Sequence, residues 1–188
     1  KNFSEIFSIK KFPIYMGVVN KNYKHEFKNL SFKINKVSGS VQIYPKVPLR
    51  KLYFKPHGSG TVGKTWENHH LSFFRFLLND FKNTVVEIGG GHNSISESIN
   101  SFKTKKKYKL LSFDPNGKKS NKFNHITFRE FFSRKHVRRF EEKISLIIHS
   151  HLFEHLYDPL NILKNMACHL KKDGIMCFAL PNMRSMVK

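Results

Sequence analysis

Two hydrophobic patterns divide the chain. Residues 1–56 alternate apolar and polar positions between turn residues, a pattern typical of short strands with one buried face. The segment Ser38–Ser40, with a central glycine, separates two such runs and predicts a hairpin turn. The rest of the chain has longer helical and continuous apolar patterns. The sequence therefore predicts a small β-rich appendage over residues 1–65 and a second domain over residues 66–188.

The second domain shows alternating helix and strand patterns. Apolar positions recur with a helical period over residues 66–81, and the run TVVEIGGG at 84–91 is continuous enough for a buried parallel strand. Asp158 and Pro159 are typical of a helix N-cap and first turn. Further helices are predicted at 93–102, 129–142 and 158–170, further strands at 108–114, 125–128, 144–150 and 175–180, and a turn at 172–174. This order predicts an α/β fold with a Rossmann-like, doubly wound and mostly parallel sheet.

Two glycine-rich segments compete for the cofactor site. The segment Gly58–Thr65 matches the phosphate-binding pattern G-x-x-x-x-G-K-[ST] at every position. However, the residues that lead into it carry charges and Pro56, which suit a central parallel strand poorly. The loop Gly89–Gly91 follows a buried strand, precedes a predicted helix and is matched by Asp114 at the end of the next strand. We assign the cofactor to this second loop, and a nucleotide-binding module built on the first is an alternative.

The second loop resembles the first motif of class I S-adenosylmethionine-dependent methyltransferases. Residues 87–93 are similar to the family pattern E-x-G-x-G-x-G, with Asn93 in place of the third glycine. The segments 149–159 and 170–182 look like the family's regions after strand four and around strand five. The resemblance implies S-adenosylmethionine as the cofactor, with a glutamate orienting its amino end and an aspartate holding its ribose. The residues that it assigns to the cofactor are Glu87, Gly89, Gly90, Gly91 and Asp114.

Within that family the chain is more similar to the sugar C-methyltransferase-like branch. The amino-terminal region of that branch carries zinc-binding cysteines, whereas the corresponding stretch here has Ser38 and Ser40. The chain has two cysteines, Cys168 and Cys177, which is too few for a four-thiolate zinc site, so we expect no metal. The resemblance implies a small-molecule acceptor, a sugar or sugar phosphate. It also implies further strands after the fifth, so we expect the domain to be incomplete at Lys188.

The candidate catalytic residues follow the fourth predicted strand. His149 and Ser150 end this strand at the carboxyl edge of the sheet, where ligands bind in α/β folds, and we assign them to the cofactor site. His151 and His155 are candidate general bases because imidazole titrates near neutral pH, and Glu154 lies between them. Lys64 and His69 are expected to line an acceptor pocket, whereas for Trp66 we favour a place in the helix core, with the pocket as the alternative.

The charge of the chain bears on its partners. The formal net charge is +21, from 34 Lys plus Arg against 13 Asp plus Glu, which favours anionic partners such as a nucleotide sugar or nucleic acid. An RNA methyltransferase is therefore the second hypothesis, although "HSHLFEH" stands where amino-directed enzymes of this class carry an Asn/Asp-Pro-Pro-aromatic run. The sequence contains no apolar run long enough to cross a membrane, and its few cysteines are expected to be reduced. We expect a cytoplasmic protein.

Overall fold

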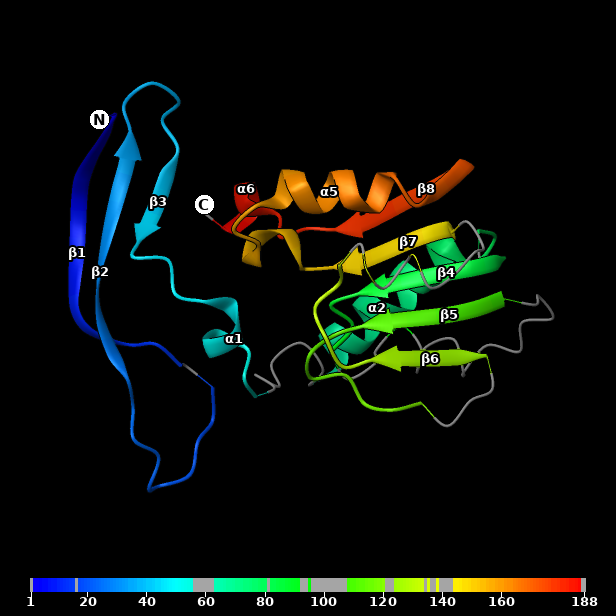
Figure 1. The fold of residues 1–188 in the computed structure, drawn as a ribbon, viewed down its shortest axis with the longest axis horizontal. Helices are drawn as coiled ribbons and strands as arrows, with labels where there is room; N and C mark the ends of the chain where they lie inside the picture. The colour runs from blue at the N-terminus through cyan, green and yellow to red at the C-terminus, as the bar shows by residue number, and fades with distance from the viewer. Residues whose placement is uncertain are drawn as a thin grey trace. The chain divides into compact units, whose positions relative to one another are not determined.

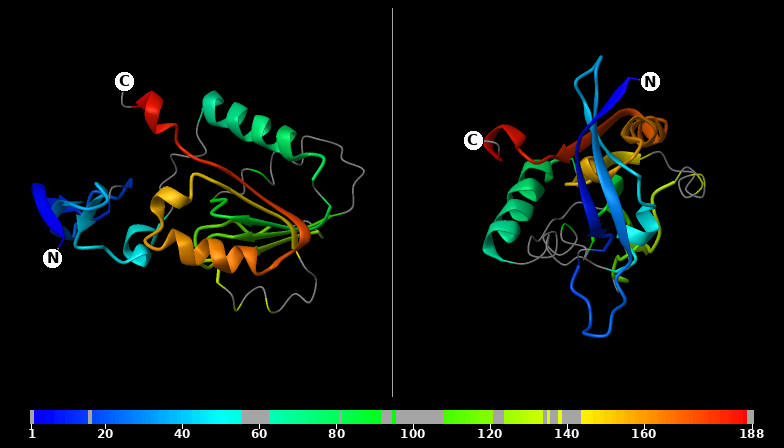
Figure 2. Two further views of the ribbon diagram at one scale, coloured as in Figure 1. Left: turned by 90° about the horizontal axis from the view of Figure 1, so that it is seen from above. Right: turned by 90° about the vertical axis from the view of Figure 1, so that its left-hand side faces the viewer.

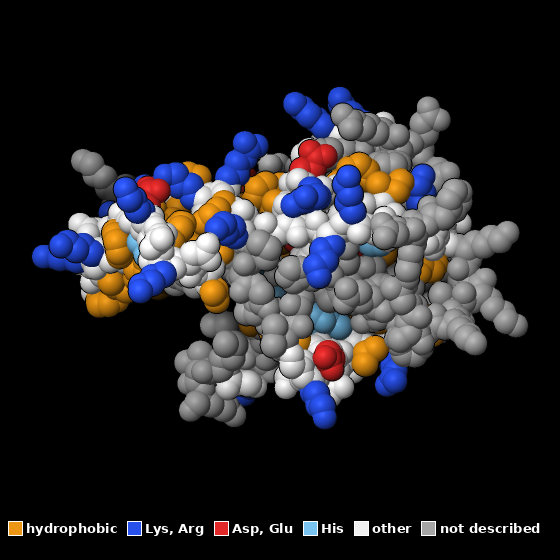
Figure 3. Space-filling view, turned by 90° about the horizontal axis from the view of Figure 1, so that it is seen from below, with side chains coloured by type: hydrophobic (Ala, Val, Ile, Leu, Met, Phe, Trp, Pro, Cys, Tyr) orange, Lys and Arg blue, Asp and Glu red, His pale blue; other side chains and the backbone are white. Residues whose placement is uncertain are grey.

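The chain folds into two units, Lys1–Gly58 and Ser59–Lys188 (Figure 1). In the computed structural model the described residues are 2–15, 17–55, 63–80, 82–91, 95, 108–120, 124–133, 135, 138 and 144–186. Among them, no helix combines the length and the apolar character needed to cross a membrane. Figure 3 shows Lys and Arg side chains dispersed over one face of the molecule, among hydrophobic and uncharged ones.

The first unit contains a three-stranded antiparallel sheet. Its strands, in the order β1-β2-β3, are β1 (Phe3–Pro13), β2 (Phe27–Asn35) and β3 (Val41–Tyr44). Gly39 has a φ of 71° in the turn between β2 and β3, a conformation that glycine adopts without steric cost. The predicted hairpin turn is therefore confirmed. The short helix α1 (Leu49–Leu52) follows the sheet.

The second unit is built on a five-stranded sheet in which every pair of neighbours is parallel. The strands are β4 (Asn83–Ile88), β5 (Tyr108–Phe113), β6 (His125–Phe128), β7 (Ile144–Ser150) and β8 (Leu170–Ala179). Their order in the sheet is β6-β5-β4-β7-β8, so the first strand of the unit lies at the centre and the order reverses beside it. This topology confirms the predicted Rossmann-like, doubly wound fold.

Helices pack on both faces of this sheet. Helix α2 (Lys64–Leu77) and helix α5 (Pro159–Ala167) lie on opposite faces (Figure 2). Phe74 and Leu77 of α2 are buried in one hydrophobic cluster with residues of β4, β5 and β7, and Met166 of α5 is buried in a second cluster on the other face. The side chain of Asp158 accepts a hydrogen bond from the backbone N–H of Asn161, which confirms the predicted N-cap of α5.

The last strand differs from the prediction. It begins at Leu170, whereas the sequence indicated a turn at 172–174 and a strand from 175. The expected turn is absorbed as an irregularity within β8, because the pairing shifts register between Ile144↔Leu170 and Leu146↔Ile175. The predicted helix at 93–102 falls almost entirely outside the described residues. The one predicted at 129–142 does not begin at 129, because residues 129–133 are not helical, and much of the rest of that range is not described.

Candidate cofactor and acceptor site

The carboxyl ends of β4, β5 and β7 lie at one edge of the sheet, because all three strands are parallel neighbours (Figure 1). The glycine loop follows β4, Asp114 follows β5 and His151 follows β7. The backbone N–H of Gly91 donates to Asp114 Oδ2 at 2.9 Å, so the loop and the acid are in direct contact. Open α/β sheets bind their ligands at this edge, where the strand order reverses.

The glycine loop needs glycine for two different reasons. Gly89 and Gly91 have φ values of 73° and 53°, in the left-handed region that residues with a Cβ atom rarely adopt. At Gly90 the constraint is space, because a Cβ atom there would lie 2.7 Å from the carboxyl carbon of Glu87. The backbone of the loop therefore rests directly on the Glu87 carboxyl group.

Glu87 is buried beneath the loop, with 2% of its surface exposed. The hydroxyl of Ser112 on β5 donates to Glu87 Oε2 at 3.2 Å and also lies 2.8 Å from Nε2 of His125 on β6. Burial raises the pKa of Glu87 to about 7, because the low-dielectric interior disfavours the carboxylate, while the hydrogen bond from Ser112 acts in the opposite direction. The carboxyl group is thus buried and hydrogen-bonded, and its burial favours the protonated form.

Asp114 is half-buried and accepts hydrogen bonds from two backbone N–H groups. Its Oδ2 accepts from Gly91, and its Oδ1 accepts from the backbone N–H of Asn116 at 2.7 Å. A carboxylate has about four lone-pair sites, and donors from the described residues are seen at two of them. Asp114 and the backbone of the glycine loop thus lie side by side at the carboxyl edge of the sheet, and their contact with a cofactor stays a prediction.

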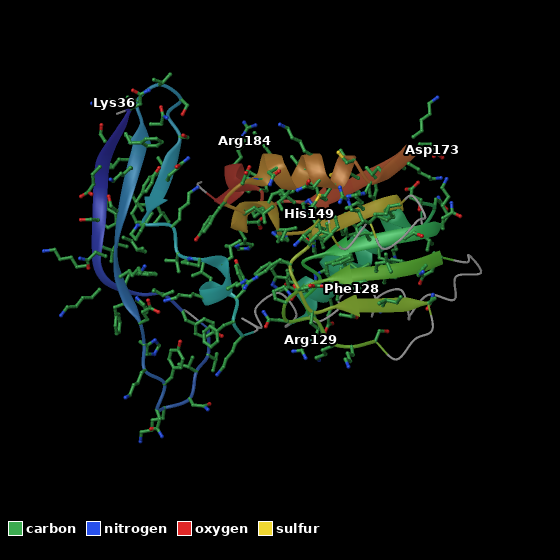
Figure 4. All side chains as sticks on the ribbon, in the orientation of Figure 1. Lys36, Phe128, Arg129, His149, Asp173 and Arg184 are labelled. Atoms are coloured by element: carbon green, nitrogen blue, oxygen red, sulfur yellow. The ribbon has the colours of Figure 1, made fainter. Side chains whose placement is uncertain are left out.

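His149 occupies a different environment from its neighbours. Its imidazole is fully buried, lies parallel to the ring of Phe178 at 5.0 Å and contacts Phe153 of the short 3-10 helix η2 (Phe153–His155) at 4.1 Å between ring centroids. Among the residues that the structure describes, none forms a hydrogen bond with either ring nitrogen, and burial lowers the pKa of His149 to about 4. Figure 4 labels this side chain. Contact of His149 with the cofactor stays a prediction.

Helix α2, the end of β7 and the segment after β7 bring six polar and aromatic side chains together. We call this group the histidine cluster. It consists of Trp66, His69, His70, Ser150, His151 and Glu154. The ring centroids of Trp66 and His151 are 5.1 Å apart, those of His69 and His151 are 5.4 Å apart, and His69 Nε2 lies 3.0 Å from the hydroxyl of Ser150.

Within the histidine cluster, His151 is paired with a carboxylate. His151 Nδ1 lies 3.2 Å from Glu154 Oε1, and both side chains are about a quarter exposed. A carboxylate that accepts the Nδ1–H fixes the tautomer in which Nε2 carries a lone pair. His151 also has a φ of 51°, and its backbone N–H donates to the carbonyl of Ala179. The chain thus turns sharply after β7 and directs His151 toward α2.

The cluster includes one residue that the sequence analysis missed. His70 is buried on the inner face of α2, one turn after Trp66, and this spacing was the available signal. Burial lowers the pKa values of His69 and His70, and the neighbouring histidines lower them further. Both imidazoles are therefore biased toward the neutral form, in which one nitrogen accepts a proton.

Three other candidates lie differently from the expectation. Trp66 is half-buried against the histidines of the cluster, so the interpretation as a helix core residue is wrong. His155 is half-exposed and its Nε2 is 4.0 Å from Glu154 Oε1, at the limit of an ion pair. Lys64, the first residue of α2, is exposed. His151 and Glu154, unlike His155, thus face a common group of side chains.

The structure also bears on the first glycine segment and on metals. The residues that precede this segment form α1 and a turn instead of a strand, and the segment 56–62 itself lies outside the described residues. Among the residues that the structure describes, no group of three His, Cys, Asp or Glu side chains is arranged to hold a metal ion. Cys168 and Cys177 are both free.

A family model described as "Methyltransferase domain" matches residues 66–187. The chain belongs to this methyltransferase domain family. The predictions of a methyltransferase domain and of S-adenosylmethionine as its cofactor are thereby confirmed, and the sugar branch stays a hypothesis. No curated protein matches the chain.

Several solved structures resemble the chain at low identity. One is the plantazolicin methyltransferase BpumL in complex with a desmethyl analogue and SAH, with a TM-score of 0.46 and 12% identity over 65% of this chain and 49% of that one. Another is a ribosomal protein L11 methylase from Lactobacillus delbrueckii subsp. bulgaricus, with a TM-score of 0.41 and 17% identity over 62% of this chain and 61% of that one. A third is coclaurine N-methyltransferase, with a TM-score of 0.41 and 15% identity over 67% of this chain and 38% of that one. The matches span less than two thirds of the neighbours' lengths.

Proposed function

We propose that the chain is an S-adenosylmethionine-dependent methyltransferase that acts on a small molecule, a nucleotide-linked or surface-glycan sugar. In this proposal residues 66–188 form the catalytic domain and residues 1–65 an appendage. The observation that carries it is the hydrogen bond between Gly91 and Asp114, because it joins the glycine loop to the acid that would bind ribose hydroxyls. The sugar assignment rests on the resemblance in sequence, and the basic side chains suit the phosphates of a nucleotide sugar.

The cofactor supplies a methyl group that is already activated on a sulfonium, so the protein has to provide placement and, for a protonated nucleophile, a base. Glu87, Gly89, Gly90, Gly91 and Asp114 would hold the cofactor, with His149 and Ser150 near the same edge of the sheet. His151 is the candidate base, because Glu154 orients its Nδ1 and leaves Nε2 able to accept a proton. His69 and Trp66 face His151 and would position the acceptor.

Calorimetric titration with S-adenosylhomocysteine tests the cofactor site. Asp114→Ala removes a charged acceptor for hydroxyl groups, a loss of about 1.5–3 kcal/mol, or roughly tenfold to 150-fold in affinity. Asp173→Ala is the matched control, since Asp173 is exposed near the amino end of β8, away from the carboxyl edge (Figure 4). Unchanged affinity in a folded Asp114→Ala variant would exclude Asp114 from the site. Magnesium-dependent ATP binding lost in Lys64→Ala would favour the first glycine segment instead.

Mass spectrometry of candidate sugars, looking for the gain of one methyl group, tests the chemistry. His151→Ala should lower kcat by about 10²–10⁴-fold if the acceptor carries a proton that His151 removes. His155→Ala should have the smaller effect, because His155 is half-exposed and lies at the edge of the ion pair. Equal activity of both variants and the wild type would remove His151 as the base. Transfer of labelled methyl groups into RNA instead of sugars would replace this proposal by the RNA hypothesis.

A further inference from the structure

A small cavity lies within the first unit. Its volume is about 190 Å³. The residues that line it are Ile14, Tyr15, Tyr23, Glu26, Lys51 and Phe54. They come from the residues just after β1, the loop before β2, and α1 with the turn that follows it, so the cavity depends on the tertiary structure of this unit.

Three aromatic rings form the walls. The rings of Tyr23 and Phe54 are nearly parallel, with an angle of 11° between their planes and centroids 6.0 Å apart. Tyr15 is inclined by 54° to Phe54 at 4.5 Å and is almost completely buried, whereas Phe54 is 43% exposed. The buried ring of Tyr15 therefore forms the floor of the cavity, and the rings of Tyr23 and Phe54 form its sides.

The position of the floor is determined by a close backbone contact. A Cβ atom at Gly17 would lie 2.3 Å from the hydroxyl oxygen of Tyr15, so only glycine leaves room for this ring. The backbone N–H of Ile14 donates to the carbonyl of Glu26, which ties the end of β1 to the loop before β2. The backbone just before Tyr15 is thus tied to this loop, and Gly17 lies against the Tyr15 ring.

A charged pair supplies the polar groups of the cavity. Lys51 Nζ donates to both carboxylate oxygens of Glu26, at 2.9 and 2.8 Å, and both side chains are half-exposed. The hydrogen bond from Lys51 lowers the pKa of Glu26. Exposed ion pairs contribute little to stability, so this pair can exchange part of its hydrogen bonding with a ligand at little cost.

We propose that this cavity binds the ring of a carbohydrate. Aromatic faces cover the apolar C–H face of a sugar ring, while one acceptor and one donor side by side match two adjacent hydroxyl groups. A cationic ligand fits less well, because Lys51 already neutralises Glu26 and residues 1–58 contain 12 Lys plus Arg against two acidic residues. The same charge favours a sugar that carries phosphate. The site is independent of the methyltransferase chemistry, and only its use for the methyl acceptor rests on the proposed function.

The test compares three probes on the whole chain by titration NMR: glucose 1-phosphate, inorganic phosphate and choline. Glucose 1-phosphate should bind at least about tenfold more tightly than inorganic phosphate, and Tyr23→Ala and Phe54→Ala should each remove most of that difference. Phe7→Ala is the matched control, because Phe7 is an exposed aromatic residue of the same unit that does not line the cavity. Lys51→Met, which keeps the aliphatic stem, should weaken glucose 1-phosphate several-fold.

Equal affinity for the two phosphate probes, or insensitivity to both aromatic variants, would overturn the proposal. Preferential binding of choline would assign the cavity to cations instead. Titration with S-adenosylhomocysteine on the same variants separates this inference from the proposed function. Sugar binding without cofactor binding would support the cavity assignment and contradict the proposed function. Cofactor binding without sugar binding would support the proposed cofactor site and overturn the cavity assignment.

Discussion

Replacing Glu87 by glutamine should stabilise the protein at alkaline pH. The folded pKa of Glu87 is raised to about 7 from an ordinary value of 4.5, so the folded chain holds a proton that the unfolded chain releases. The stability of the wild type is therefore highest below pH 4.5 with respect to this group and falls as the pH rises through 7. Glutamine has no charge to desolvate and can keep the hydrogen bond with Ser112.

The magnitude follows from the size of the shift. Raising the pKa from 4.5 to about 7 corresponds to about 3 kcal/mol, at 1.36 kcal/mol for each unit. Above pH 7 the Glu87→Gln variant should thus exceed the wild type by up to about 3 kcal/mol in free energy of unfolding, and near pH 4 the two should converge. A stabilising change at a residue assigned to the cofactor is expected, because functional sites commonly hold groups in unfavourable environments.

Urea unfolding at a series of pH values between 4 and 8 measures this difference. Glu67→Gln is the control, since Glu67 is an exposed carboxylate on α2 and its replacement makes the same chemical change outside the buried site. S-adenosylhomocysteine binding should weaken in Glu87→Gln even as stability rises. A Glu87→Gln profile parallel to the wild type, or a loss of stability at pH 8, would refute the argument that burial dominates the energetics of Glu87.

Three further changes test other parts of the second unit. The folded pKa of His149 is lowered to about 4, so below pH 6.5 the unfolded chain takes up a proton that the folded chain does not, and the wild type loses stability. His149→Phe should remove this loss, which amounts to up to about 3 kcal/mol between pH 6.5 and 4, as measured by urea unfolding. Gly90→Ala should cost about 1–3 kcal/mol, since its Cβ atom would lie 2.7 Å from the Glu87 carboxyl carbon. Gly39→Asn should cost less, because nothing lies within 4 Å and asparagine adopts the left-handed conformation of Gly39, with a φ of 71°, more readily than most residues. Asp158→Ala should lower the free energy of unfolding by about 1 kcal/mol through loss of the N-cap, and Asp158→Asn should retain most of it.

The sheet and the cofactor loop could be predicted because their signals are local. The strand predicted at residues 144–150 matches β7 at both ends, because its apolar residues 144 and 146–148 are buried on both faces of the sheet. Gly91 and Asp114 were placed together because parallel neighbouring strands bring their carboxyl ends to one edge.

The histidine cluster and the aromatic cavity could not be predicted from local patterns. His151 faces Trp66 because its backbone adopts a left-handed conformation after β7. A histidine in the sequence does not predict this conformation, which few residues other than glycine adopt. Tyr15, Tyr23 and Phe54 come from three separate segments, so no periodicity connects them. Non-local contacts of this kind depend on how elements pack, which a single sequence specifies only indirectly.

The buried line of Glu87, Ser112 and His125 crosses three adjacent strands, and its protons cannot be assigned independently. A serine hydroxyl has one hydrogen, so when Ser112 donates it to the Glu87 carboxylate, His125 Nε2 has to be the donor toward Ser112. Once Glu87 is protonated, its own hydrogen can point to Ser112, and the serine hydrogen is then released toward a His125 Nε2 that carries a lone pair. The ionisation of Glu87 beneath the glycine loop is therefore coupled to the tautomer of a histidine two strands away, and the nitrogen chemical shifts of His125 report on it.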